Sequence, residues 1–405
     1  MIVIADKLLT RSDGDPLEDH AMLVRGSTIA AIGTRERIIR SHRRDRILRF
    51  DGCVLLPGLV NVHTHLELPP LMSSLRGRDY ASWVLDLIRV KAGLTAKDYR
   101  SAVRNNIRDL IRSGTTTVAE ISTHNASPEI LKRSGLRAVV YHEIISMRPG
   151  SAVTIPPRRR DSSLMRYGLS PHSPHTVSEQ ALTFLHRYAK KNRFPLCMHV
   201  AESKDEGLLL GRRKSSLEKI YRAAGWDRDW APRARSAFQY LDRLGMVSPD
   251  LLGVHAVHAD VDDIRIIARN GASVAHCPRS NHSLRVGTMD LRAMLDAGVH
   301  VGLGTDSLAS VPTLNLWDEM RAAYALHRSR GVTPSDILDL ATRGGAEALG
   351  MQGSIGVLEE GKRADCIVVP RPRRDTGDLC SDLLRETKSS IMTMVNGRIL
   401  HQERR

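Results

Sequence analysis

The distribution of apolar and polar residues divides the chain into a β-rich beginning, a long middle and a β-rich end. Eight short apolar segments in the middle are typical of strands: LLPGLVNVHTH, TTTVAEI, LRAVVYHE, RYGLSPHS, FPLCMHV, LLGVHAV, GASVAHCP and VHVGLGTD. Several are separated by stretches with the apolar period of a helix, such as AKDYRSAVRNNIRDLIRSG and MDLRAMLDAG. Alternation of strands and helices predicts a parallel sheet, and eight such units predict a (β/α)8 TIM barrel.

The two ends of the chain share a different pattern. MIVIADKLLT and HAMLVRGSTIAAIG near the start, and ADCIVV and SIMTMVNGRIL near the end, are short strand-like runs separated by turns. The Asn-Gly pair in the last of them favours a tight hairpin. We therefore expect residues 1–55 and 355–405 to form one small β-sandwich domain, and residues 56–354 to form the catalytic barrel.

Polar residues that can do chemistry lie where the predicted strands end. In a (β/α)8 barrel the carboxyl ends of the strands form the face that carries the active site. The residues at or near these ends are His65, Glu120, His142, His172, His199, His255, His276 and Asp306. This clustering predicts a site built from several strands at once.

The pair His63 and His65 indicates a metal site. Residues two apart on a strand share a face, so the two imidazoles can reach one point. His199 and Asp306, at the ends of two other strands, complete a set of three imidazoles and one carboxylate. Such a set suits one divalent ion, Zn²⁺ first and Fe²⁺ second, and leaves a position open for water.

With these residues in place, the chain resembles the amidohydrolase superfamily, in the branch of mononuclear-metal deaminases and related chlorohydrolases. The resemblance spans nearly the whole chain. It rests on PGLVNVHTHLE, SPHSPHTVS, HVAESKDE, HCPRSNHSL, GLGTDSLAS and LEEGKRADCIVV. Members with two metals carry a lysine after the fourth strand, whereas this strand ends in LSPHSPH, which favours one metal.

The resemblance implies a role for each residue near the metal. Asp306 would accept the proton of the attacking water while it contacts the metal. Glu202 would serve as general acid and then general base, and His255 would orient the hydroxide and stabilise the developing oxyanion. His258 competes with His255 for that role, although His255 lies at the strand end. His172 matches a histidine that contacts substrate in nucleoside deaminases of the family.

The segment after the first barrel strand bears on the substrate. The stretch around Trp83 resembles a tryptophan-containing helix that covers the pocket in the nucleoside deaminases. Glu67, two residues after His65, could return to the same face and contact substrate or a ligand histidine. The motifs HTHLEL and GTDSLAS make the aminodeoxyfutalosine deaminases of menaquinone synthesis the closest resemblance. That substrate carries a benzoate, an anion with which Arg76, Arg89 or Lys91 could pair.

Other substrates remain open. Methylthioadenosine/adenosylhomocysteine deaminases place a ribose-binding glutamate shortly after the tryptophan, and this chain has none after Trp83. Guanine or cytosine deaminases and triazine chlorohydrolases are further alternatives. A scaffold that has lost its chemistry is a different class of function, but the complete ligand set argues against it.

Composition narrows the class of protein further. The formal net charge is +15, which fits a solvated arginine-rich surface, affinity for nucleic acid or attraction of an anionic small molecule. Aromatic residues make up only 4%, too few for a platform that stacks nucleic-acid bases, so we do not expect a nucleic-acid partner. The five cysteines are scattered, without the pattern of a disulfide framework, which fits the reducing cytoplasm. No apolar run is long enough for a membrane span, so we expect a cytoplasmic protein. A homodimer or larger homo-oligomer is expected from the resemblance alone.

Overall fold

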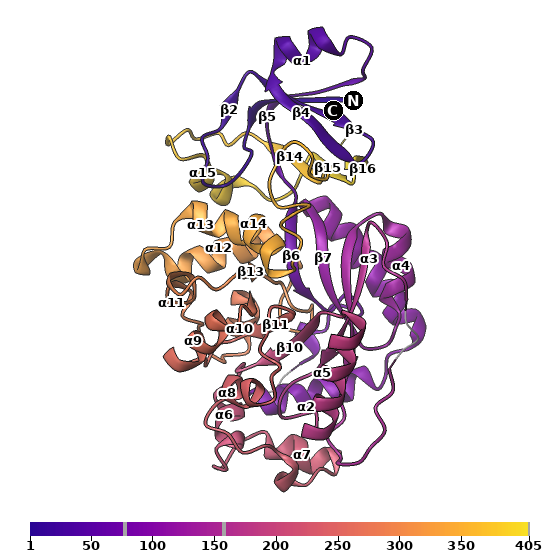
Figure 1. Cartoon of the computed structure of the whole chain (residues 1–405), viewed down its shortest axis with the longest axis vertical. Helices are drawn as coiled ribbons and strands as arrows, with labels where there is room; N and C mark the ends of the chain where they lie inside the picture. Colours follow the sequence, from indigo (N-terminus) through magenta and orange to yellow (C-terminus); the bar gives the residue numbers. More distant parts are fainter. Residues whose placement is uncertain (76–78, 156–158, 404–405) are drawn as a thin grey trace.

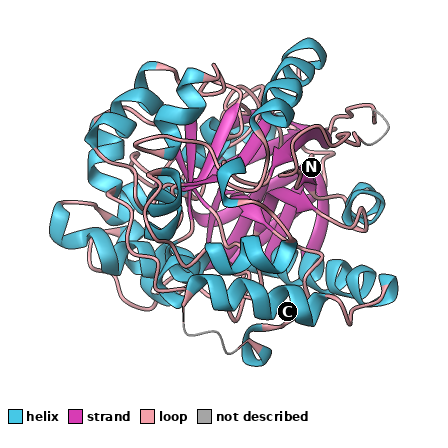
Figure 2. Ribbon diagram, turned by 90° about the horizontal axis from the view of Figure 1, so that it is seen from below, coloured by secondary structure: helices cyan, strands magenta, loops and turns pink. Residues whose placement is uncertain are grey.

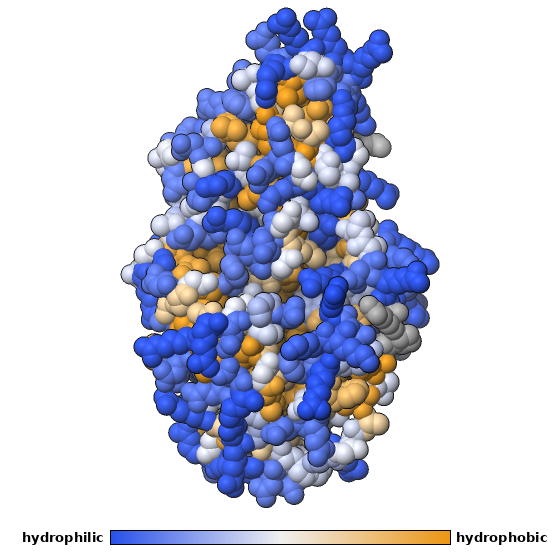
Figure 3. Space-filling view, viewed as in Figure 1, coloured by the Kyte–Doolittle hydropathy of each residue, from blue (hydrophilic) through white to orange (hydrophobic). Residues whose placement is uncertain are grey.

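Two sheets organise the molecule, one closed into a barrel and one built from both ends of the chain. The computed structural model describes residues 1–75, 79–155 and 159–403. Figure 1 shows the terminal sheet at the top, where both termini lie, and the barrel below it. On the face in Figure 3, hydrophilic side chains cover most of the surface over both parts.

The barrel contains the eight strands that the sequence predicts. Every hydrogen-bonded neighbour in this sheet is parallel, and the strands follow one another in chain order. A parallel bridge between Thr64 and Asp306 brings the last strand beside the first, so the predicted (β/α)8 barrel is confirmed. The strands are β6 (Leu59–Thr64), β7 (Thr115–Ser122), β8 (Arg137–Ile144), β9 (Met165–Pro171), β10 (Leu196–Val200), β11 (Leu251–His255), β12 (Ser273–His276) and β13 (Val301–Leu303).

Helices surround the barrel, as the view along it in Figure 2 shows. The helix α3 illustrates why they form: Thr95 and Asp98 make a capping box at its start, and Gly114, with φ of 97°, ends it in the left-handed region. The helices are α2 (Tyr80–Lys91), α3 (Ala96–Ser113), α4 (Ser127–Ser134), α5 (Glu179–Asn192), α6 (Lys204–Leu210), α7 (Glu218–Ala224), α8 (Ala237–Arg243), α9 (Val261–Arg269), α10 (Pro278–Ser283), α11 (Leu291–Asp296), α12 (Leu316–His327), α13 (Pro334–Leu340) and α14 (Arg343–Ala348). Within the described ranges, no helix is both long and apolar enough to cross a membrane.

Strands from both termini pair into one mixed sheet, in the order β16-β15-β14-β5-β1-β3-β4, with β2 paired to β1. The expected hairpin near the end is present, with Asn396 and Gly397 at φ of 53° and 75° between its strands. The elements of this part are β1 (Ile2–Leu8), β2 (Leu17–Glu18), β3 (His20–Arg25), β4 (Thr28–Thr34), α1 (Arg35–Ser41), β5 (Ile47–Pro57), β14 (Cys366–Pro370), α15 (Leu379–Glu386), β15 (Met392–Val395) and β16 (Arg398–Gln402).

The junction between the sheets is closely packed. Gly58 separates β5 from β6, and a Cβ there would come within 2.2 Å of the Thr116 hydroxyl, so the chain passes only because the residue is glycine. Arg137 of β8 forms a buried bidentate ion pair with Asp365, at 2.8 and 3.0 Å, just before β14. These contacts join the barrel to the terminal sheet.

Candidate metal-dependent active site

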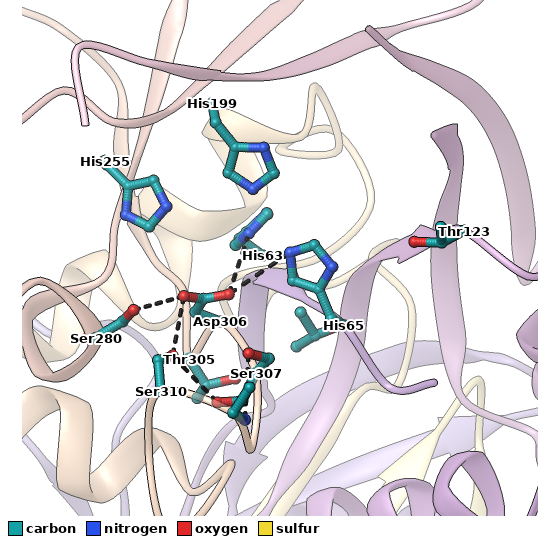
Figure 4. A network of polar contacts seen from close by, with 12 residues as sticks. His63, His65, Thr123, His199, His255, Ser280, Thr305, Asp306, Ser307 and Ser310 are labelled. Atoms are coloured by element: carbon teal, nitrogen blue, oxygen red, sulfur yellow. Dashed lines mark hydrogen bonds and ion pairs between the residues drawn. The ribbon is translucent and has the colours of Figure 1, made fainter. Parts of the chain in front are cut away.

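Three histidines converge at the carboxyl ends of the barrel strands. His63 lies in β6, His65 directly follows it, and His199 lies in β10. One ring nitrogen from each lies within 4.8 Å of the other two, although His199 is distant in sequence. Figure 4 shows the three rings facing a common point. The structure therefore brings together the imidazoles that the sequence predicts as metal ligands.

The hydrogen bonding of these rings leaves nitrogen atoms free for a metal. His63 is fully buried, and neither of its ring nitrogens has a hydrogen-bond partner in the described structure. Burial and the neighbouring histidines lower the pKa of His63 well below its usual value, which favours the neutral ring that binds metal. His199 donates its Nδ1 hydrogen to the carbonyl of His172 at 3.0 Å, which fixes the ring and leaves Nε2 for the site.

Asp306 supplies the carboxylate. Its Oδ1 lies 3.8 Å from Nε2 of His63 and 3.5 Å from Nε2 of His65. Its Oδ2 accepts hydrogen bonds from the hydroxyls of Ser280 and Ser310, which orients the group (Figure 4). Burial favours a raised pKa for Asp306, but the nearby imidazoles and the Ser280 hydrogen bond outweigh it and lower the pKa. Free imidazole nitrogens beside an ionised carboxylate fit one divalent cation.

Glu202 and His255 lie beside this ligand group as a pair. His255 Nε2 is 3.6 Å from Glu202 Oε1, and its Nδ1 hydrogen is donated to Asn281 Oδ1 at 2.8 Å. His255 has a φ of 73°, a conformation that few non-glycine residues adopt and that is enriched at functional sites. His258, by contrast, donates Nε2–H to the Val286 carbonyl at 2.7 Å. Of the two histidines, His255 faces the site.

Tyr80 is a site residue that sequence reasoning missed. Its hydroxyl donates to Glu202 Oε2 at 2.6 Å, across 122 positions of sequence. Burial, followed by the charge of Glu202, raises the pKa of Tyr80 well above its usual value, so the phenol keeps its proton. No local sequence signal connects Tyr80 at the start of α2 with Glu202 after β10, because the contact depends on how α2 folds over the barrel.

A cavity of about 190 Å³ opens over the ligand group. Its polar wall comes from the strand ends, and much of its apolar wall comes from α2 and from the segment around α7. The residues that line it are His65, Leu68, Tyr80, Trp83, Val84, Leu87, Ile88, Lys91, Thr123, Glu143, Ile145, His172, Thr176, His199, Glu202, Ile220, Trp226, His255, Asp306 and Ser307. His172 and Trp83, both expected to contact substrate, are among them.

Glu67 does not line this cavity, contrary to expectation. Its carboxylate is buried and accepts hydrogen bonds from the Ser122 hydroxyl and from backbone N–H groups between Thr123 and Ser127. Five donors occupy its oxygens, so Glu67 organises the loop between β7 and α4 and has no oxygen left for substrate.

Arg89 also lies outside the cavity lining. Its side chain is 76% exposed and pairs with Asp86 at 2.7 Å, so it points into solvent and not toward the site. Lys91, two residues later in the same helix, lines the cavity and takes the position expected of an anion partner. Arg76, the third basic residue considered for this role, lies outside the described residues.

The other polar strand ends serve different purposes. Glu120 accepts hydrogen bonds from Leu66 N–H and the Thr64 hydroxyl, and burial raises its pKa well above the usual value. His276 is buried against His327 with Nε2 atoms 3.2 Å apart, not in the cavity wall. The pattern of polar strand ends therefore predicted more site residues than the structure places in the cavity.

The amidohydrolase family model matches residues 54–400 of this chain. The chain belongs to the amidohydrolase family. This assignment confirms the resemblance and the expectation of an amidohydrolase-family enzyme. A relative from Syntrophobacter fumaroxidans, described as a 5-methylthioadenosine/S-adenosylhomocysteine deaminase, is 30% identical over 97% of this chain and 90% of its own length.

Solved structures share the fold. An aminofutalosine deaminase from Helicobacter pylori, in complex with methylthio-coformycin, superposes with a TM-score of 0.86 at 24% identity, over 98% of this chain and 99% of that one. An adenosine deaminase from Xanthomonas campestris with bound zinc gives a TM-score of 0.84 at 24% identity, over 100% of this chain and 93% of that one. Both likenesses cover the barrel and the terminal sheet together.

Proposed function

We propose that this protein removes the 6-amino group of an adenine nucleoside by hydrolysis and releases ammonia. One observation carries the proposal: the Glu202–His255 pair lines the same cavity as His65, His199 and Asp306, and the buried His63 completes this ligand group. A carboxylate–imidazole pair beside a group of free metal ligands supports the proposal, because hydrolysis of an amidine carbon requires a proton carrier next to the metal. The relative with 30% identity, described as a 5-methylthioadenosine/S-adenosylhomocysteine deaminase, supports the choice of substrate class.

The metal in this proposal is a single divalent ion, Zn²⁺ first and Fe²⁺ as the alternative. His63, His65 and His199 would hold it through their free nitrogens, and Asp306 through Oδ1. When bound, such an ion acts as a Lewis acid that lowers the pKa of water toward neutrality. The remaining steps belong to the side chains of this protein.

Proton transfer follows from the positions of the carboxylates. Asp306, held by Ser280 and Ser310, accepts a proton from the water that adds to carbon 6. Glu202 delivers a proton to ring nitrogen 1 during the addition. The proton on Asp306 then passes to the amino group, which leaves as ammonia, while Glu202 takes back the hydroxyl proton of the adduct as the carbonyl forms. His255 Nε2 faces Glu202 and contacts the adding oxygen, because its other nitrogen is held by Asn281.

His172 and the apolar wall would hold the base. The Nδ1 of His172 lies 2.9 Å from the Thr176 hydroxyl, and its ring centroid lies 4.9 Å from that of His199. The ring is therefore fixed beside the metal group and can present its other nitrogen to the base. Trp83 of α2 and Trp226 after α7 contribute flat apolar surface to the same cavity.

The substrate that we propose first is 6-amino-6-deoxyfutalosine. Its benzoate carboxylate requires a cation, and Lys91 lines the cavity at the end of α2. Methylthioadenosine is the second candidate, because Leu87, Ile88 and Ile145 would surround an apolar methylthio group. The two candidates differ in whether Lys91 contributes to binding.

Ammonia release from a substrate panel tests the proposal. The zinc-loaded protein would be assayed with aminodeoxyfutalosine, methylthioadenosine, adenosylhomocysteine, adenosine, guanine, cytosine and a chlorotriazine. We expect ammonia from the adenine nucleosides, with the highest kcat/KM for aminodeoxyfutalosine. Ammonia from guanine or cytosine only, or chloride from the triazine only, would contradict the proposed substrate class.

A further inference from the structure

One ionisable group in the cavity has no part in the chemistry above. Glu143, in β8, lines the cavity together with Glu202 and Asp306. The latter two carry protons in the proposed reaction, whereas Glu143 belongs to a different part of the wall. Sequence reasoning did not single out Glu143, because it took His142, the preceding residue, as the polar end of this strand.

The contacts of Glu143 leave it able to accept hydrogen bonds from a ligand. Thr123 donates its hydroxyl hydrogen to Oε2 at 2.7 Å, and no other hydrogen bond to the carboxylate is present among the described residues. Burial favours a raised pKa for Glu143, but His172, His65 and Lys91 outweigh it and lower the pKa to about 2. The group is thus an anion at neutral pH with acceptor capacity to spare.

The position of Glu143 suits the sugar end of a nucleoside whose nitrogen 1 faces Glu202. Its carboxylate lies within 4.8 Å of a ring nitrogen of His172 and of His199. In Figure 4, its partner Thr123 lies on the opposite side of the histidine group from His255 and Ser280. A base whose nitrogen 1 faces Glu202 therefore directs its glycosidic bond toward the Glu143 side.

Helix α2 supports the same orientation. It has 12 residues, about 18 Å of helix at about 1.5 Å per residue. Tyr80 at its start donates a hydrogen bond to Glu202, and both Lys91 at its end and Glu143 line the same cavity. A cavity covered along the length of α2 suits a base followed by a ribose.

We propose that Glu143 accepts hydrogen bonds from the 2′- and 3′-hydroxyls of the ribose and so makes the enzyme selective for ribonucleosides. This inference rests on the proposed function. A carboxylate can accept from two vicinal hydroxyls at once, and such charge-assisted bonds are stronger than those of an amide. Glu143 thereby compensates for the absence of a glutamate after Trp83 in α2.

A cycle of variants and substrates tests this assignment. The zinc-loaded wild type, Glu143→Gln and the control Glu36→Gln, whose side chain is exposed on α1, would be assayed with adenosine and 2′,3′-dideoxyadenosine. For Glu143→Gln we expect kcat/KM for adenosine to fall about 10- to 100-fold, mainly through KM, and that for the dideoxy compound to change less than about threefold. The control should match the wild type with both substrates.

Product binding gives a second readout that needs no chemistry. Inosine and 2′,3′-dideoxyinosine would be titrated against the same proteins, with quenching of Trp83 and Trp226 fluorescence as the signal. The preference of the wild type for inosine should disappear in Glu143→Gln.

Two results would overturn the assignment alone. These are equal losses with both substrates, or loss of bound zinc in Glu143→Gln, which would make Glu143 a metal ligand. If the zinc-loaded wild type releases no ammonia from any adenine nucleoside of the panel, the proposed function fails and this inference fails with it.

Discussion

The two walls of the cavity are built in different ways. The strand-end wall includes His65, His199, His255 and Asp306, with the fully buried His63 beside them. Most of these residues are buried, and hydrogen bonds fix several of the side chains. The helical wall consists of the lining residues of α2 together with Ile220 and Trp226. It is largely apolar and partly exposed to solvent, with Ile88 54% exposed. The first wall suits chemistry that needs exact positions, and the second suits selection among substrates.

This contrast is consistent with how (β/α)8 barrels divide stability from specificity. The strand-end wall inherits its geometry from the parallel register of the barrel, so its residues are separated by fixed distances. The helical wall depends on contacts of α2 with α7 and the neighbouring residues, where Tyr80, Val84 and Leu85 pack against the cluster around Tyr221. Substitutions in the two walls should therefore differ in the size and kind of their effects.

The largest effect is expected from removal of a ligand in the strand-end wall. His63→Ala should lose both bound zinc and activity, because it removes a ligand whose two ring nitrogens are buried and have no hydrogen-bond partner among the described residues. Metal analysis by mass spectrometry after dialysis, together with the ammonia assay, measures this. His282→Ala changes an exposed histidine and should retain zinc and turnover. Stoichiometric zinc in His63→Ala would remove His63 from the ligand set.

Glu202→Gln should lower kcat by about 10²- to 10⁴-fold and leave the zinc content unchanged. The amide keeps the hydrogen bond from Tyr80 and the shape of the wall but cannot carry a proton. Zinc content and kcat measured on the same preparation separate this from loss of metal. Near-normal turnover in Glu202→Gln would contradict the role of Glu202 as proton carrier.

The strand-end wall could be predicted from local pattern and fold class, whereas only Trp83 and Lys91 of the helical wall were expected, and these from the family resemblance. Strand periodicity placed His63 and His65 on one face, and the rule that sites form at the carboxyl ends of strands brought in His199 and Asp306. Both arguments need only local pattern and the fold class. The same rule also selected Glu120 and His276, but Glu120 binds the backbone N–H of Leu66 and His276 contacts His327, so neither lines the cavity.

The residues that were missed or misplaced depend on long-range packing. Tyr80 reaches Glu202 only because α2 folds across the barrel, and Ser280 reaches Asp306 from the start of α10. Glu67 follows the strand that carries two ligands, yet it turns toward the loop after β7, where five donors are available. Such competition between a cavity and nearby backbone donors has no signature in a single sequence.

Tyr80 links the two walls, so Tyr80→Phe measures how strongly the helical wall supports the chemistry. The substitution keeps the ring and removes the hydroxyl that holds Glu202 Oε2 at 2.6 Å. We expect kcat to fall about tenfold with KM little changed, since a hydrogen bond to a charged group is removed. Tyr324→Phe in α12, outside the cavity lining, serves as control. A rise in KM without a fall in kcat would make Tyr80 a substrate contact and not a positioning residue.

The smallest effect, and the one that tests selection by the helical wall most directly, comes from its two basic residues. Lys91 lines the cavity, whereas Arg89 points into solvent toward Asp86. Lys91→Ala should therefore raise KM for aminodeoxyfutalosine about three- to tenfold and leave KM for methylthioadenosine nearly unchanged, because only the first carries a carboxylate. Arg89→Ala is the matched control and should change neither value. If Arg89→Ala instead produces the selective rise in KM, α2 must rotate when substrate binds, and the apolar wall that it carries must rotate with it.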